Sequence, residues 1–187
     1  MSRLLPKARP TPRLQGEMSG SDPKGTSGGG RVRSVKGWFW TPLIAGLSGT
    51  IVHFLFMYVK SRAGLLPSFQ PYQNLQHALG QLVGTNVPAI VPWILSFING
   101  MAILGFLFGR IQTLLPGRSG LSKGVIFGLI GWVMMGLIFF PLIGLGLFAF
   151  GAGLGIAPTL FSLAMLLTYS VVLATVYVAL DRRSKTA

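Results

Sequence analysis

His53 is the only ionisable side chain well inside an apolar segment of this 187-residue chain, and so the first candidate for chemistry. The three acids, Glu17, Asp22 and Asp181, all lie near the two ends. Paired-carboxylate acid–base catalysis, carboxylate-bridged metal sites and Asp or Glu proton relays therefore lack their essential group in the middle of the chain. The absence of cysteine removes thiolate catalysis, cysteine-ligated zinc and iron–sulfur clusters. We therefore expect neither an enzyme active site nor a metal site.

A histidine inside an apolar segment has three chemical uses. It can form a hydrogen bond to a polar side chain of a neighbouring helix, for which Asn99, Ser96 and Thr168 are the candidates. It can bind haem iron, or contact a pigment or a quinone. It can also take part in moving a proton or a substrate. We predict the first role for His53 and a similar packing role for Asn99, with cofactor binding as the alternative for His53.

The elements that must position these side chains are membrane spans. From Gly124 to Leu180 the chain carries no formal charge. The mean hydropathy of the whole chain is +0.63. A soluble protein needs surface charge, so such a segment belongs in lipid. Apolar runs of about 20 residues predict an all-α membrane protein with a four-helix bundle. We expect a transmembrane domain of residues 38–183, in which spans 1 to 4 cover residues 39–59, 88–108, 124–144 and 159–180. Residues 71–84 separate apolar from polar side chains at helical spacing and predict a short interfacial helix.

The distribution of basic residues predicts the orientation through the positive-inside rule. Most of the 16 Lys and Arg lie in the N-terminal region, between spans 2 and 3, and at the C-terminus. We expect both termini to be cytoplasmic, most simply in a bacterial inner membrane. Residues 1–37 have the composition of a disordered basic tail, and residues 184–187 form a short C-terminal tail. The net charge of +13 is then a topology signal rather than a surface for nucleic acid. Arg31, Arg33 and Lys36 are expected at the membrane surface, near anionic headgroups.

Spans 1 and 3 contain similar sequences. Residues 46–58, GLSGTIVHFLFMY, align without gaps on residues 128–140, GLIGWVMMGLIFF. This internal repeat predicts two copies of a helical hairpin related by an axis along the membrane normal. The alternative is that two glycine-rich apolar helices are similar by composition alone. Met135 matches His53 in this alignment, and because His and Met form a haem ligand pair, Met135 is the candidate second ligand.

Small residues repeat along one face of spans 1, 2 and 3. Lipid gives no hydrophobic driving force for helix association, so small faces matter because they let backbones approach closely. We expect these faces in the bundle interior or in a contact with another chain. The glycines concerned are Gly46 and Gly49 in span 1, Gly105 and Gly109 in span 2, and Gly124, Gly128 and Gly131 in span 3.

Three short motifs carry a family resemblance. Residues 128–132 (GLIGW), residues 141–148 (PLIGLGLF) and the turn at residues 115–117 (LPG) resemble those of small four-span bacterial membrane proteins of unknown function. The resemblance covers about residues 40–180 and implies a four-helix membrane fold. It implies no activity, cofactor or site residue.

These observations favour a non-catalytic accessory or structural subunit of a larger membrane complex of the energy-converting kind. The expected partners are the lipid bilayer and either other membrane subunits or a second copy of this chain. One alternative is a redox protein that binds haem, a pigment or a quinone at His53, although the sequence requires no cofactor. Another is a small transporter or channel, which would need more polar side chains along its path than this chain supplies.

Overall fold

The computed structural model describes residues 35–186, with the side chains of residues 39–184. In this part of the chain every regular element is a helix, and four helical segments are long and apolar enough to cross a membrane. They cover Phe39–Arg62, Ile90–Ile111, Gly120–Leu142 and Ala157–Ser184. The predicted four-helix membrane fold is confirmed, as is the additional short helix. Of the predicted tail, residues 1–34 lie outside the described residues, while helix α1 already begins at Val35.

Spans 1 and 4 are continuous helices, whereas spans 2 and 3 are interrupted by π-helical segments. A π turn is rare in proteins and frequently marks a functional site. Span 1 is α1 (Val35–Arg62) and span 4 is α7 (Ala157–Thr186). Span 2 consists of α3 (Ile90–Ile98), η1 (Asn99–Leu104) and α4 (Gly105–Ile111). Span 3 consists of α5 (Gly120–Met134), η2 (Met135–Phe139) and α6 (Phe140–Leu142).

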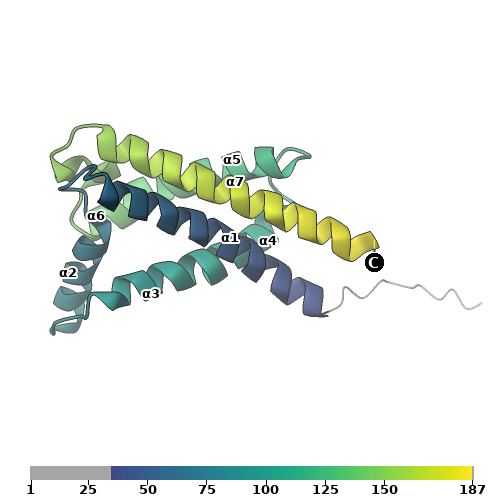
Figure 1. The fold of residues 1–187 in the computed structure, drawn as a ribbon, viewed down its shortest axis with the longest axis horizontal. Coiled ribbons are helices and arrows are strands. Elements are labelled where there is room, and N and C mark those ends of the chain that lie inside the picture. The colour runs from purple at the N-terminus through teal and green to yellow at the C-terminus, as the bar shows by residue number, and fades with distance from the viewer. Residues whose placement is uncertain (1–34, 187) are drawn as a thin grey trace, which may run out of the picture. The chain divides into compact units, whose positions relative to one another are not determined.

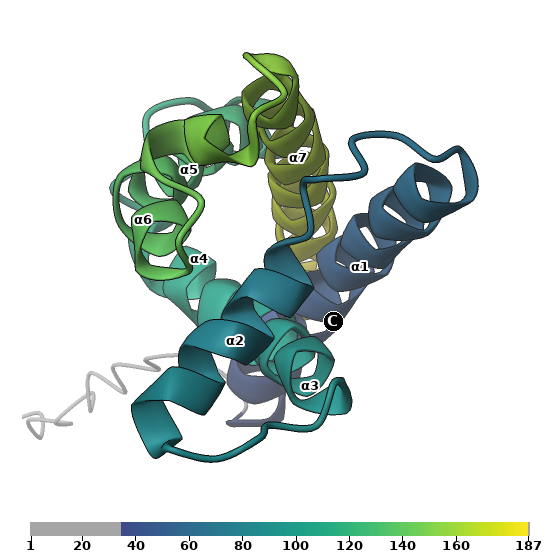
Figure 2. The same ribbon diagram turned by 90° about the vertical axis from the view of Figure 1, so that its left-hand side faces the viewer.

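The order of the spans around the bundle is 2, 1, 4, 3 (Figures 1 and 2). Helix α7 packs along both α1 and α5, and α1 also packs against η1 and α4. In the described residues, no comparable packing joins span 2 to span 3. The bundle is therefore held together through spans 1 and 4, and one of its four sides lacks extended helix packing.

Glycines bring the packed helices close together. A Cβ on Gly46 would collide with the carbonyl oxygen of Met101, and one on Gly105 would lie 2.5 Å from the carbonyl oxygen of Pro42. These two glycines let spans 1 and 2 cross with their backbones in contact. Gly124 does the same between spans 3 and 4, where its Cβ would lie 2.7 Å from the Cα of Val171.

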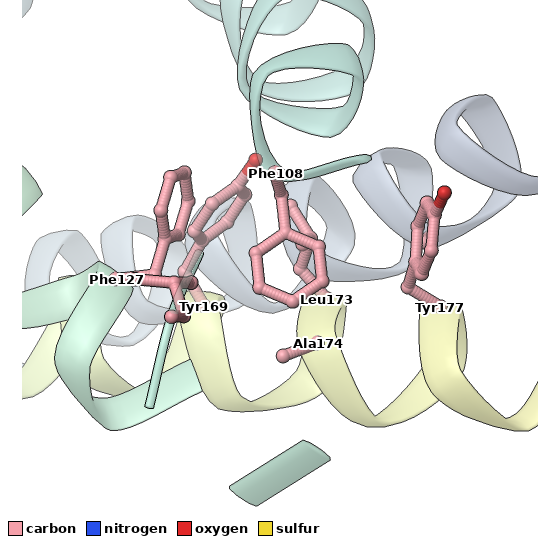
Figure 3. Close-up of a cluster of buried hydrophobic side chains, with 8 residues drawn as sticks. Phe108, Phe127, Tyr169, Leu173, Ala174 and Tyr177 are labelled. Carbon is pink, nitrogen blue, oxygen red and sulfur yellow. The ribbon is translucent and has the colours of Figure 1, made fainter. Parts of the chain in front are cut away.

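Two clusters of buried side chains fill the two halves of the bundle. The first contains residues of all four spans and lies nearer the end that carries the C-terminus. Figure 3 labels six of its members: Phe108, Phe127, Tyr169, Leu173, Ala174 and Tyr177. The second lies at the opposite end, around Phe69 and Phe140, whose ring centroids are 5.8 Å apart. Between these clusters the interior is less completely filled, as the site below shows.

Two short elements cover the end of the bundle opposite the C-terminus. Helix α2 (Pro71–Val83) is the short helix expected from the sequence, and it lies across this end (Figure 2). It ends at Gly84 in the left-handed conformation that glycine adopts readily. The 3-10 segment η3 (Leu147–Ala152) connects spans 3 and 4, and the hydroxyl of Thr159 donates a hydrogen bond of 2.6 Å to its Phe148 carbonyl. These elements form the cap of the bundle.

Candidate ligand cavity between the spans

A cavity of about 640 Å³ lies between the four spans. All four spans and α2 contribute to its wall, and most of the lining side chains are apolar. Along span 2 the lining runs from Leu95 to Ile111, which is about 24 Å at the helical rise of 1.5 Å per residue. Both the volume and this length suit an elongated small molecule, since ligand pockets are commonly a few hundred to about 1,000 Å³.

The cavity is bounded at both ends. At the cap, Pro71, Tyr72 and Leu75 of α2 line it. The Asn74 side chain donates a 3.3 Å hydrogen bond to the carbonyl of Ile143, which ties α2 to the end of span 3. Towards the other end, the rings of Phe108 and Phe127 meet edge to face with centroids 5.3 Å apart, and they connect spans 2 and 3 there.

Between these two ends the cavity reaches the surface on the side where spans 2 and 3 face each other. Several of its lining residues are exposed, and they belong to these two spans: Leu95, Asn99 and Leu107 in span 2, and Ile130 and Met134 in span 3. This is the side without extended helix packing. Because the spans place it at membrane depth, the opening faces lipid rather than water.

Both spans beside the opening carry their π segment at the cavity. Segment η1 begins at Asn99 and η2 begins at Met135, and both residues line the cavity. The hydroxyl of Tyr169 donates a hydrogen bond of 2.6 Å to the carbonyl of Gly100 within η1. This buried bond from span 4 stabilises span 2 in its irregular form, since a π turn disturbs the usual pairing of helix carbonyls.

His53 takes part in a short hydrogen-bonded chain at the cap end of the cavity. Its Nε2 lies 2.8 Å from the hydroxyl of Tyr72, and this hydroxyl lies 3.2 Å from Oγ of Ser96. The ring of Tyr72 also stacks on Trp93, with centroids 4.0 Å apart. Either direction of donation satisfies the chain, because both hydroxyls donate and accept and the imidazole has two tautomers. One tyrosine of α2 is thus bound to both span 1 and span 2.

The prediction of which residue would bond to His53 was wrong in part. The sequence suggested Asn99, Ser96 or Thr168, whereas the structure pairs His53 with Tyr72 and brings in Ser96 through it. Thr168 instead donates to the carbonyl of Ala164 in its own helix. The predicted role for His53, a hydrogen bond that connects helices, agrees with this geometry.

The pKa of the Tyr72 hydroxyl is raised above its ordinary value of 10.0. Burial is the main cause because it disfavours the phenolate, and the hydrogen bond with Ser96 opposes it. Tyr72 is therefore a neutral hydrogen-bonding group throughout the physiological range.

Two further polar side chains lie at the cavity without a partner among the described residues. Asn99 is exposed, and no hydrogen bond joins its side-chain amide to another described residue. Ser170 is buried, and its Oγ has no hydrogen-bonding partner in this part of the chain. Thr50 differs, since its hydroxyl donates a 2.8 Å hydrogen bond to the carbonyl of Gly46. The wall therefore retains unused hydrogen-bonding capacity, which is costly to leave unsatisfied in an apolar setting.

Met135, the predicted counterpart of His53, lines the same cavity. The two residues that the sequence offered as cofactor ligands, on spans 1 and 3, therefore lie on the wall of one cavity. In the part of the chain that the structure describes, no three His, Cys, Asp or Glu residues are grouped as a metal site would require. The duplication of the two hairpins stays a prediction.

The seven glycines of the predicted small faces all lie against other helices. Gly46 and Gly105 pack between spans 1 and 2, and Gly49 packs on the ring of Tyr169. Gly131 has the most room, since its Cβ would meet Leu166 at an ordinary distance of 3.5 Å. The remaining three face span 4 from spans 2 and 3: Gly109 faces Tyr177, Gly124 faces Val171, and Gly128 faces Ser170 and Leu167.

The structure describes the side chains of some basic residues but not those of others. Arg31, Arg33 and the side chain of Lys36 lie outside the described residues, so their membrane-surface role stays a prediction. Lys60, at the end of span 1, is only 3% exposed. Its Nζ lies 5.8 Å from the centroid of the Phe69 ring, in a cation–π contact that burial strengthens.

A protein-family model described as a family of unknown function, DUF6789, matches residues 39–187. The chain belongs to this family. The match covers all four spans and agrees with the resemblance to small four-span membrane proteins. No curated protein and no solved structure matches the chain. Family membership and the four spans establish an integral membrane protein of the DUF6789 family, and the family description adds no activity.

Sequence reasoning about this DUF6789 member missed Tyr72 as a site residue. The helical spacing of residues 71–84 had placed Tyr72 on the apolar side of the short helix, which predicts burial but names no partner. The position of Tyr72 at the start of α2, directly after a proline, was an available signal for a fixed geometry.

Proposed function

We propose that this protein binds a lipid-soluble ligand within the membrane, in the cavity between its four spans. The observation that carries this proposal is the cavity of about 640 Å³, which is walled by every span and reaches the lipid-facing surface between spans 2 and 3. Helix bundles characteristically place ligand sites between their helices. A ligand dissolved in the bilayer would enter from the side, without passing through water.

In this proposal the protein is a non-catalytic binding protein. The acid-free spans supply no general acid–base pair, so the chain is suited to holding a molecule rather than converting it. An accessory subunit of a larger, energy-converting membrane complex would use such a site to store or present a lipid-soluble molecule to a partner chain. The mass of the particle extracted in mild detergent tests the subunit role, because a free protein would have the mass of this chain and its detergent alone.

The proposed orientation has both termini in the cytoplasm of a bacterial cell. It is supported by the basic residues Arg110, Arg118, Lys123, Arg182 and Arg183, which lie at the end of the spans opposite α2. The cap and the His53–Tyr72–Ser96 chain would then lie near the outer surface of the inner membrane.

A pair of substitutions at one position tests ligand binding. Gly131 lines the cavity, and the structure tolerates a Cβ there. Gly131→Phe is expected to fill part of the cavity, whereas Gly131→Ala leaves it nearly unchanged. Each protein is purified in mild detergent, and its retained lipids are quantified by mass spectrometry. We expect one ligand class near stoichiometric amounts with wild type and Gly131→Ala, and much less with Gly131→Phe. Equal lipid content in all three proteins, with no class enriched, would contradict the proposal.

A second candidate is a cofactor protein in which His53 and Met135 act on haem or a pigment. It is favoured by one observation, the position of both residues on the wall of the same cavity. The hydrogen bond between His53 and Tyr72 opposes it, because iron ligation through Nε2 requires this bond to break. An absorption spectrum of the purified protein separates the two candidates. A visible absorption band that His53→Asn abolishes, while the fold survives, supports the cofactor protein. A wild-type protein without a visible band contradicts a haem or pigment and favours the first proposal.

A further inference from the structure

Most of the polar side chains that are free or weakly bonded at the cavity wall lie in its cap half, and Ser170 is the exception near Phe127. Asn99, Ser96 and the Tyr72 hydroxyl lie at the cap half of the cavity, while Leu104, Leu107 and Phe127 line the other half. The lining described by the structure contains no Lys, Arg, Asp or Glu. Apart from the buried Ser170 hydroxyl, the wall therefore has a short hydrogen-bonding region at the cap and a longer apolar region.

Lys60 is not among the residues that line the cavity. Lys60 is buried, and its ammonium lies over the ring of Phe69, a residue that forms part of the wall. Phe69 in turn packs edge to face on Phe140 and Phe161. An anionic headgroup would have to displace this aromatic cluster to reach Lys60. Without such a pairing, a charge moved into the cavity loses its solvation and gains no counter-charge.

Among the residues that line the cavity, Asn99 is best placed to recognise the polar head of a lipid-soluble ligand. Its side chain is exposed at the cavity, it offers both an N–H donor and a carbonyl acceptor, and neither is used by another described residue. Tyr72 and Ser96, by contrast, already bond to each other and to His53. A hydroxyl or carbonyl on the ligand would satisfy the amide of Asn99 where lipid tails cannot.

We infer that the ligand is an uncharged lipid with a small hydrogen-bonding head, such as an alcohol or a carbonyl-bearing ring, and a single apolar chain. This inference rests on the proposed function and names its ligand class. The head would lie at Asn99 in the cap half, and the chain would extend toward Phe127. Phospholipids and fatty-acid anions are disfavoured because their charged heads find no partner on the wall.

Three test lipids that differ only in the head examine this inference. Hexadecanol, hexadecyl phosphate and hexadecane are added separately to the protein in nanodiscs, and retained adducts are measured by native mass spectrometry. We expect hexadecanol to be retained most strongly. Asn99→Leu is expected to lower hexadecanol retention about five-fold, the size of one lost hydrogen bond, while leaving hexadecane retention unchanged. Since Asn99 bonds to no described side chain, this variant is expected to fold normally.

The other outcomes separate the inference from the proposed function. Preferential retention of hexadecyl phosphate, with a loss of that preference in Lys60→Met, would overturn the uncharged head while leaving the cavity in use. Equal retention of hexadecane and hexadecanol, unaffected by Asn99→Leu, would overturn the role of Asn99 and the hydrogen-bonding head. If none of the three lipids is retained, both the inference and the proposed function fail.

Discussion

Gly105→Ala should loosen the contact between spans 1 and 2. A Cβ at this position would lie 2.5 Å from the carbonyl oxygen of Pro42, about 0.9 Å short of the 3.4 Å at which ordinary contact begins. The obstacle is backbone, so the two helices must move apart, and such overpacking costs about 1–3 kcal/mol. The better helix propensity of alanine returns up to about 1 kcal/mol. We expect the free energy of unfolding to fall by about 1–2 kcal/mol, measured by denaturing-detergent titration in mixed micelles.

Gly131→Ala is the matched control for this prediction. It makes the same change within a membrane helix, but its Cβ meets Leu166 at 3.5 Å, an ordinary contact. Stability should stay the same or rise by up to about 1 kcal/mol, because the propensity gain remains and the collision is absent. If Gly105→Ala proves as stable as Gly131→Ala, the close backbone crossing of spans 1 and 2 is refuted.

Three further predictions concern single side chains. Ser170→Ala should leave the free energy of unfolding unchanged or raise it, since the buried hydroxyl has no partner among the described residues. Ser162→Ala should lower the free energy of unfolding by about 1 kcal/mol, because the Ser162 hydroxyl donates a hydrogen bond to the Thr159 carbonyl, and thermal unfolding of the two variants tests the contrast. Because the pKa of Tyr72 is raised in the folded protein, its contribution to stability should be complete below the ordinary pKa of 10.0 and be lost as the pH rises through the folded value. Unfolding titrations on both sides of that pH should therefore show a smaller alkaline loss in Tyr72→Phe than in the wild type, and equal losses would contradict the assignment. In this cysteine-free chain, Ser119→Cys and Ser68→Cys should be labelled from opposite sides of the membrane by an impermeant thiol reagent, and labelling from one side would refute the proposed orientation.

The amino-acid sequence by itself determined the class of protein and the number of spans. The stretch from residue 124 to residue 180 carries no charge and has no stable place in water, and apolar runs of about 20 residues form helices in lipid because their backbone groups must be satisfied internally. The short helix at residues 71–83 was predictable for a similar reason, since its apolar and polar sides are separated at helical spacing. Glycine spacing likewise predicted which faces of the spans permit close approach.

The tertiary structure alone decided how those elements form a site. Composition identified His53 as the unusual group, but its partner Tyr72 is 19 residues away, on a helix whose return over the bundle no periodicity encodes. The π segments and the unpacked side between spans 2 and 3 are equally invisible in the sequence, because an apolar helix face is compatible with lipid, with another helix and with a cavity. Which of the three it meets depends on how four helices divide a limited contact area, and here that division leaves a cavity beside Asn99.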